Sequence, residues 1–158
     1  VSLSRYVTAV ASGNLYDYQL MSKIVDANDQ VIASYEPKST SVTSVLDTEG
    51  WQAIHSGMRM VIENMSEFDE FPVEIAGKTG TAQQVETRPN HALFVGYAPY
   101  SDPEISIATR IAYGYSSHNA ASVSKNIISY YYGVETLEDI LAKNASGANS
   151  SSNNAVTD

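Results

Sequence analysis

One stretch of eight residues gathers groups that could bind an anionic substrate: Ala76-Gly77-Lys78-Thr79-Gly80-Thr81-Ala82-Gln83. Lys78 brings a positive charge, and the hydroxyl groups of Thr79 and Thr81 are hydrogen-bond donors, a combination that suits a carboxylate. Gly80 has no side chain, and a glycine within a strand often marks a point where a ligand or another backbone approaches closely. The alternation of apolar and polar residues before the stretch predicts a β-strand. We therefore interpret it as an active-site strand for a substrate that carries a carboxylate.

The composition excludes several classes of function. The 158 residues carry a formal net charge of −9 with only nine Lys and Arg, and because phosphate binding needs clustered basic residues, we expect no nucleic-acid partner. The chain has no cysteine, which excludes disulfides and thiolate metal sites. The histidines His55, His91 and His118 are too far apart to form a local metal motif, and we leave His91 unassigned. No apolar run approaches the roughly 20 residues of a membrane span, so we expect no direct membrane contact from this segment.

Before the motif, the sequence predicts two helices and a hairpin. Residues 3–12 are typical of the last turns of a helix that stops at Gly13-Asn14. Because the sequence begins within this helix and without a capping residue, we expect a piece of a longer protein. Residues 18–25 and 31–35 flank a turn-rich centre and predict a β-hairpin, followed by a linker over 37–43. A second helix is expected to begin near 44–47, with a core-facing stripe of Trp51, Ile54, Met58, Val61 and Met65.

After the motif, an apolar run at 91–98 predicts a strand buried on both faces, and 104–112 predicts another, with Ile105, Ile107, Thr109 and Ile111 on one face. Three consecutive strands are therefore expected to form an antiparallel meander. A helix over about 119–132 should follow, with Ala120, Val123, Ile127 and Tyr131 facing inward, and 137–141 should add one turn. These elements predict an α+β fold in which the meander packs with helices. We expect a folded segment over 1–143 and a disordered Ser/Asn-rich tail over 144–158.

Lys-Thr-Gly-Thr on a strand is also the third signature of the penicillin-recognising serine acyltransferases. Its context extends the match, through Gly57-Met58-Arg59-Met60-Val61 before it and His91-Ala92-Leu93-Phe94-Val95-Gly96-Tyr97-Ala98-Pro99 after it. The helix end from Arg5-Tyr6-Val7 to Ala11-Ser12-Gly13-Asn14 fits as well. From about Leu3 to Gly133 the chain resembles the C-terminal part of the transpeptidase domain of class B penicillin-binding proteins. The resemblance implies the C-terminal half of a penicillin-binding transpeptidase or serine β-lactamase-like fold.

The other two signatures of that family, Ser-x-x-Lys and Ser-x-Asn, have matches here only in the wrong places. Ser122-Val123-Ser124-Lys125 falls in the last expected helix, after the Lys-Thr-Gly strand, whereas the family places its nucleophile before that strand. Ser12-Gly13-Asn14 is better explained as a helix C-terminus with Gly in the left-handed position. Glu63-Asn64-Met65 also stands where the family often has Gly-Thr-Ala. We therefore expect the nucleophilic serine and its base to lie outside this chain, which should be inactive alone.

The resemblance implies a peptidoglycan DD-transpeptidase whose partners are stem peptides ending in D-Ala-D-Ala, β-lactams and the upstream half of the domain, with no cofactor and no metal. Lys78, Thr79, Gly80 and Thr81 would bind the substrate, and Lys78 and Thr81 would also act in catalysis, Thr81 through its backbone N–H as one oxyanion donor. The protein would work outside the cytoplasm, anchored to the membrane through its N-terminal part. A non-catalytic β-lactam or peptide sensor, an assembly module and a β-lactamase-like hydrolase remain alternatives. Without the upstream half we expect an exposed apolar sheet face and an unpaired edge at 104–112.

Overall fold

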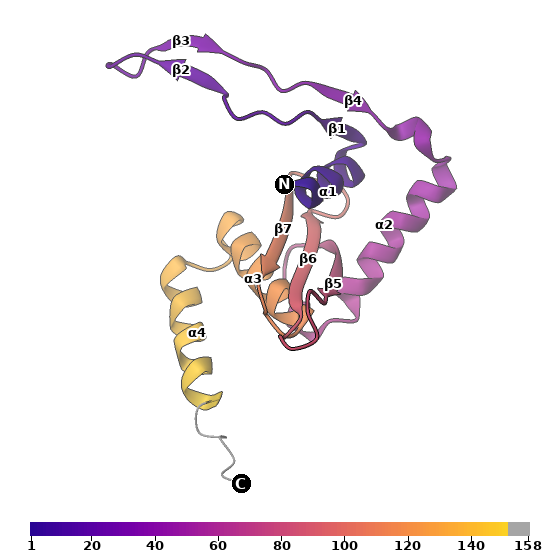
Figure 1. The fold of residues 1–158 in the computed structure, drawn as a ribbon, viewed down its shortest axis with the longest axis vertical. Helices are drawn as coiled ribbons and strands as arrows, with labels where there is room; N and C mark the ends of the chain where they lie inside the picture. Colours follow the sequence, from indigo (N-terminus) through magenta and orange to yellow (C-terminus); the bar gives the residue numbers. More distant parts are fainter. Residues whose placement is uncertain (152–158) are drawn as a thin grey trace.

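An antiparallel sheet of three strands forms the centre of the molecule. The computed structural model describes residues 1–151, and its sheet contains β5 (Ala76–Ala82), β6 (His91–Ala98) and β7 (Ile105–Ile111) in the order β5-β6-β7 (Figure 1). β6 lies in the middle, and seven of its eight residues are buried. The predicted meander is therefore confirmed, with the motif strand at one edge and β7 at the other.

Helices cover both faces of this sheet. On one face, Val95 and Tyr97 of β6 pack against α1 (Ser2–Ser12) and α2 (Thr48–Glu63), with Val7, Val10 and Met58 as the buried contacts. On the other face, Phe94 and its neighbours pack against α3 (Ser117–Tyr131) and the short η2 helix (Ser66–Phe68). The expectation of an exposed apolar sheet face is therefore wrong, because α1, α2 and α3 of the same chain cover it.

The ends of α1 and α2 follow from their sequences. Gly13 has φ of 70°, and its N–H donates to the Ala9 carbonyl at 2.9 Å, so α1 stops where predicted. α2 begins after Asp47, whose carboxylate accepts from the Gly50 N–H at 2.8 Å. The core stripe of α2 is confirmed at Met58, which is buried, whereas the side chain of Trp51 is only half-buried.

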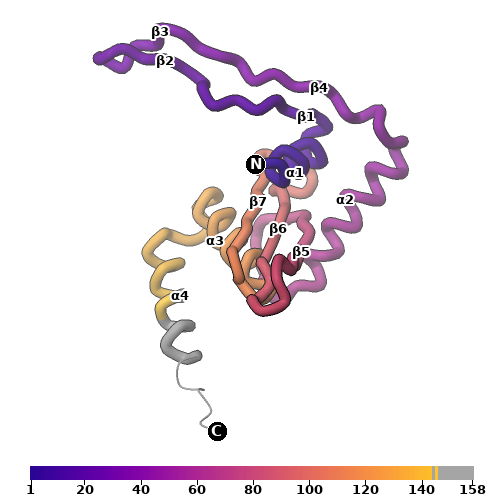
Figure 2. The backbone as a smooth tube through the Cα atoms, viewed as in Figure 1, coloured from indigo at the N-terminus to yellow at the C-terminus, as the bar shows by residue number. Residues whose placement is uncertain are grey.

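A long two-stranded arm extends from the body between α1 and α2 (Figure 2). β1 (Asn14–Tyr16) pairs with β4 (Ser39–Ser41), and further out β2 (Lys23–Val25) pairs with β3 (Val31–Ser34). The predicted hairpin is confirmed, but the linker prediction for 37–43 misses β4 and the 3-10 helix η1 (Thr43–Val45). β4 consists of Ser39, Thr40 and Ser41, so no apolar alternation announces it.

The inward face of α3 differs from the prediction. Ala120 is buried as predicted, but Val123, Ile127 and Tyr131 are 41%, 46% and 56% exposed. The other buried residues of α3 are Ala121, Ser124, Ile128 and Ser129. Ser124 is tolerated inside because its hydroxyl donates to the Ala120 carbonyl at 2.8 Å and lies 2.7 Å from the Thr109 hydroxyl. Small residues let the helix lie close to the sheet, which the apolar spacing alone does not reveal.

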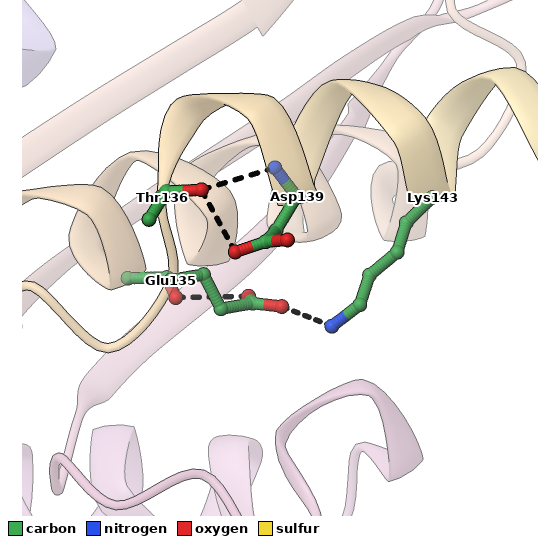
Figure 3. Close-up of polar contacts among 5 residues, drawn as sticks. Glu135, Thr136, Asp139 and Lys143 are labelled. Atoms are coloured by element: carbon green, nitrogen blue, oxygen red, sulfur yellow. Dashed lines mark hydrogen bonds and ion pairs between the residues drawn. The ribbon is translucent and has the colours of Figure 1, made fainter.

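α4 (Leu137–Ser151) is longer than the single expected turn. The Thr136 hydroxyl accepts from the Asp139 N–H at 3.2 Å and donates to its carboxylate at 2.7 Å, which caps the start of the helix (Figure 3). The Glu135 carboxylate pairs with the ammonium of Lys143, which lies one turn after Asp139 in α4 (Figure 3). Residues 144–151 of the expected tail thus belong to a helix. Residues 152–158 lie outside the described residues. The domain boundary at 143 stays a prediction.

Candidate active site

The motif strand offers one free edge. β5 pairs with β6 through a register that sets Lys78 opposite Val95 and Gly80 opposite Leu93, and in the described part of the chain no strand lies on its other side. A peptide in an extended conformation can add to such an edge by main-chain hydrogen bonds. The edge therefore has the geometry that binds a peptide lengthwise.

Two cavities meet at Lys78 and Thr79. One, of about 380 Å³, lies between the first half of α1, the middle of α2 and the middle of β5. It is lined by Lys78, Thr79, Gly80 and apolar side chains that include Tyr6, Met58 and Leu93. The other, of about 470 Å³, is shared with Gly57, Met60, Val61 and Asn64 of α2 and the residue after it. The structure thus brings Lys78, Thr79 and Gly80 together, while Thr81 is exposed and lines neither cavity.

The positive charge of Lys78 is available to a ligand. Its ammonium donates to the Thr79 carbonyl at 3.1 Å, and among residues 1–151 no carboxylate forms an ion pair with it. Arg59 of α2, in contrast, pairs with Glu63 at 3.1 Å and donates to the Ile75 carbonyl at 2.9 Å. Arg59 therefore holds the start of the motif strand, and Lys78 is left to attract an anion.

The two motif glycines have different surroundings. A Cβ atom on Gly77 would lie 2.5 Å from the ring of Phe94, which is fully buried, so packing of the core demands glycine there. A Cβ atom on Gly80 would lie 3.4 Å from Leu93 Cβ, an ordinary contact. Packing therefore does not explain Gly80, and the free space in front of it belongs to the cavity beside Lys78.

The family model described as "Penicillin binding protein transpeptidase domain" matches residues 1–129. This chain belongs to that family. Peptidoglycan D,D-transpeptidase MrdA of Haemophilus influenzae is 29% identical over 101 residues, which cover 51% of this chain and 16% of the relative. MrdA of Acinetobacter baumannii is 38% identical over 72 residues, which cover 37% of this chain and 11% of the relative. The resemblance to class B penicillin-binding proteins is thus confirmed, over part of the domain.

Solved structures support the same fold. The imipenem acyl-enzyme complex of penicillin-binding protein A from M. tuberculosis superposes with a TM-score of 0.70 at 20% identity, covering 82% of this chain and 29% of that one. The expected α+β fold of a transpeptidase domain is therefore confirmed over this portion. The chain spans a sixth or less of the curated relatives that it matches.

The two misplaced signature matches lie on helices. Ser122 lies on α3, across the sheet from the cavity beside Lys78, and the Lys125 ammonium lies 5.5 Å from the centre of the Phe71 ring. Ser12 is the last residue of α1, and its hydroxyl donates to the Thr8 carbonyl at 2.8 Å. That both serines are structural residues without a catalytic role stays a prediction.

Sequence reasoning missed two buried polar groups near the site. The Tyr97 hydroxyl lies 3.1 Å from His55 Nδ1, and burial, with a smaller contribution from Tyr100, raises the pKa of Tyr97 to about 12. His91 is 6% exposed and contacts Gln84, Arg110 and Tyr113. No local pattern could find these groups, because the contacts of Tyr97 with His55 and of His91 with Arg110 and Tyr113 join residues that are distant in the sequence.

Within the described residues, no helix is both long and apolar enough to cross a membrane.

Proposed function

We propose that this chain supplies the substrate-binding strand of a peptidoglycan D,D-transpeptidase, a serine acyltransferase that cross-links stem peptides. The observation that carries the proposal is Lys78-Thr79-Gly80-Thr81 on a strand whose outer edge pairs with no other strand in the described residues. Within residues 1–151 the Lys78 ammonium forms no ion pair with a carboxylate. Membership of the transpeptidase family and the similarity to MrdA support it.

A stem peptide ending in D-Ala-D-Ala would lie along the outer edge of β5. Lys78 and Gly80 point to one face of the strand and Thr79 and Thr81 to the other, so one ligand meets all four only from the edge. The two threonine hydroxyls would hold the terminal carboxylate while Lys78 supplies the attractive charge. Gly80 would let the peptide backbone approach.

The backbone N–H of Thr81 would donate to the oxyanion that forms when a serine hydroxyl attacks the peptide carbonyl. Loss of one such donor costs about 3 kcal/mol of transition-state stabilisation, so the second donor, the nucleophile's own N–H, is essential. Attack would expel the terminal D-Ala and leave an acyl-enzyme. An amine of a neighbouring stem peptide would then accept the acyl group and release the serine. Lys78 would also contact the serine of the Ser-x-Asn signature.

We propose that the nucleophilic serine lies upstream in a longer protein, because the only Ser-x-x-Lys match here is at Ser122 on the wrong side of the sheet. That protein would act outside the cytoplasm, where peptidoglycan is, held by an N-terminal anchor. β-Lactams would acylate the same serine, as imipenem does in the M. tuberculosis relative.

Labelling with fluorescent penicillin tests the proposal. We expect no covalent label on these 158 residues alone and a label on the longer protein, with Ser122→Ala labelled as strongly as wild type. Thr81→Val, which keeps the shape but loses the hydroxyl, should label more slowly. A stable adduct on Ser122 would refute the assignment, and a longer protein that binds penicillin without acylation would indicate a sensor instead.

A further inference from the structure

The start of β6, the connection before it and the loop after β7 meet at the buried imidazole of His91. Its Nε2 lies 2.9 Å from Gln84 Oε1, in the connection between β5 and β6, and its Nδ1 lies 3.0 Å from the backbone nitrogen of Tyr113, which follows β7. The rings of His91 and Tyr113 also stack with centroids 4.8 Å apart. His91 therefore joins the end of the motif hairpin to the loop after β7.

The contacts select one form of the ring. A backbone N–H can only donate, so Nδ1 of His91 must be the unprotonated acceptor for Tyr113. Nε2 then carries the proton and donates to Gln84 Oε1. The Arg110 guanidinium lies 3.2 Å from Nε2, but both groups are donors in this tautomer, so this contact is not a hydrogen bond.

The hydrogen bonds continue beyond the ring. Gln84 Oε1 also accepts from the Tyr113 hydroxyl at 3.3 Å, and this hydroxyl accepts from Arg88 at 2.9 Å. Arg88 lies in the same connection as Gln84, and its guanidinium also covers the Tyr113 ring, 5.2 Å from the centroid. The connection between β5 and β6 is thus held by two of its own residues.

The loop after β7 is a firm support for these contacts. Tyr113 and Tyr115 have φ of 54° and 61°, which is uncommon for residues other than glycine and occurs where the surroundings determine the backbone. Between them, a Cβ atom on Gly114 would lie 2.9 Å from Ala92 Cβ, so the loop lies directly on β6. Tyr115 N–H also donates to the Asn90 carbonyl at 3.1 Å.

This support reaches the end of the motif strand through the register. His91 pairs with Ala82, and Ala92, against which the loop packs, pairs with Thr81. Gln84 follows Thr81 by three residues. Movement of the hairpin end would therefore displace the backbone of Thr81, and a displacement of about 1 Å in a reacting site can cost about 100-fold in rate.

We propose that His91, through its Nε2–H bond to Gln84, is a positioning residue that fixes the backbone of Thr81 for the acylation step. The role of Thr81 rests on the function proposed above. In this role His91 touches no reacting atom and acts through the hairpin.

The test uses the full-length protein and two variants that share the loss of the bond between His91 and Gln84. His91→Asn retains an acceptor near Nδ1 but loses this bond and the ring contact with Tyr113. Gln84→Met loses the same bond and the one from the Tyr113 hydroxyl, at an exposed residue outside the core. His91→Gln retains a donor near Nε2. His118→Asn is the matched control, because His118 is an exposed histidine at the start of α3 that contacts Glu67 of η2.

We expect His91→Asn and Gln84→Met to lower the rate constant for acylation by fluorescent penicillin by about 10- to 100-fold. The penicillin concentration that gives half the maximal rate and the melting temperature of Gln84→Met should stay near wild type, while His91→Gln retains more activity than His91→Asn. Backbone hydrogen exchange over 80–86 should become faster in His91→Asn and Gln84→Met and stay unchanged in His118→Asn.

Unchanged acylation in folded Gln84→Met and His91→Asn would overturn the positioning role. If the wild-type protein is not acylated at all, the proposed function fails, and hydrogen exchange still decides the role of His91: unchanged exchange over 80–86 in both variants overturns it. Nitrogen NMR signals of His91 that show the proton on Nδ1 would overturn it as well.

Discussion

Replacing Gly80 with alanine separates the two reasons for which a strand can require glycine. The new Cβ would lie 3.4 Å from Leu93 Cβ and 3.7 Å from its Cδ1, so it fits without movement of the core. Because alanine restricts the unfolded chain more than glycine does, Gly80→Ala should leave the free energy of unfolding unchanged or raise it by about 0.5 kcal/mol. In the proposed function, a methyl group at this position would nevertheless stand where the peptide backbone approaches β5.

Gly77→Ala is the matched comparison in the same strand. Its Cβ would lie 2.5 Å from Phe94 Cζ and 3.0 Å from the Val95 carbonyl oxygen, and Phe94 is fully buried between β5, η2 and α3. Forcing an extra methyl group into a packed core costs about 1–3 kcal/mol. We expect Gly77→Ala to lower the free energy of unfolding by that amount, mainly by displacing the Phe94 ring.

Urea unfolding and penicillin acylation of the full-length protein measure the two effects. Gly80→Ala should unfold at the wild-type urea concentration and be acylated at least about 10-fold more slowly, since the rate of acylation depends on near-attack geometry. Gly77→Ala should unfold at lower urea. If Gly80→Ala is acylated at the wild-type rate, the substrate does not approach β5 there. If Gly80→Ala is destabilised as much as Gly77→Ala, the role of this glycine is structural.

Three further predictions concern polar contacts around the sheet. Arg59→Met should lower the free energy of unfolding, measured by urea titration, by about 1–3 kcal/mol, because the Ile75 carbonyl before β5 loses its charged donor. Tyr97→Phe should cost about 1 kcal/mol through loss of the bond to His55. Because the folded-state pKa of Tyr97 is raised from 10.0 to about 12, its contribution is full below pH 10 and is lost as the pH rises toward 12, a loss that alkaline titration of Tyr97→Phe should not show. The hydrogen bond from Lys143, followed by that from Ser129, lowers the pKa of the Glu135 carboxyl from its usual 4.5. The stabilisation of α4 by ionised Glu135 is therefore full above pH 4.5 and is lost as the pH falls through the lowered pKa. Hydrogen exchange of α4 should become faster over this acidic range in wild type and show no such change in Glu135→Gln.

The central sheet was predictable from the sequence because its signals are local. β6 is an almost unbroken apolar run from His91 to Ala98, which is what a strand buried on both faces requires. Gly13 ends α1 in a left-handed conformation and Asp47 caps α2, and both residue types announce these roles. The predicted order of three consecutive antiparallel strands also sets β5, as the first of them, at an edge of the sheet.

The parts that the sequence did not reveal depend on contacts between distant residues. Ser124 faces inward on α3 because a hydroxyl on β7, that of Thr109, lies 2.7 Å away, and the helix turns so that Val123 faces solvent. Apolar periodicity alone favours the opposite orientation. At the site, Lys78, Thr79 and Gly80 were found by motif, whereas His91 acquires its importance only when the loop containing Tyr113 folds against it.

A free strand edge serves the proposed function and also carries a risk, since unpaired backbone groups can pair with any extended chain. β5 and β7 both pair only with β6 in the described residues, and each carries one exposed basic residue, Lys78 on β5 and Arg110 on β7. Charged residues on edge strands discourage pairing with another sheet. On β5 the same lysine also favours a peptide that brings a negative charge. Main-chain hydrogen bonds do not distinguish one extended chain from another, so charge is what allows the edge of β5 to prefer a peptide with a terminal carboxylate.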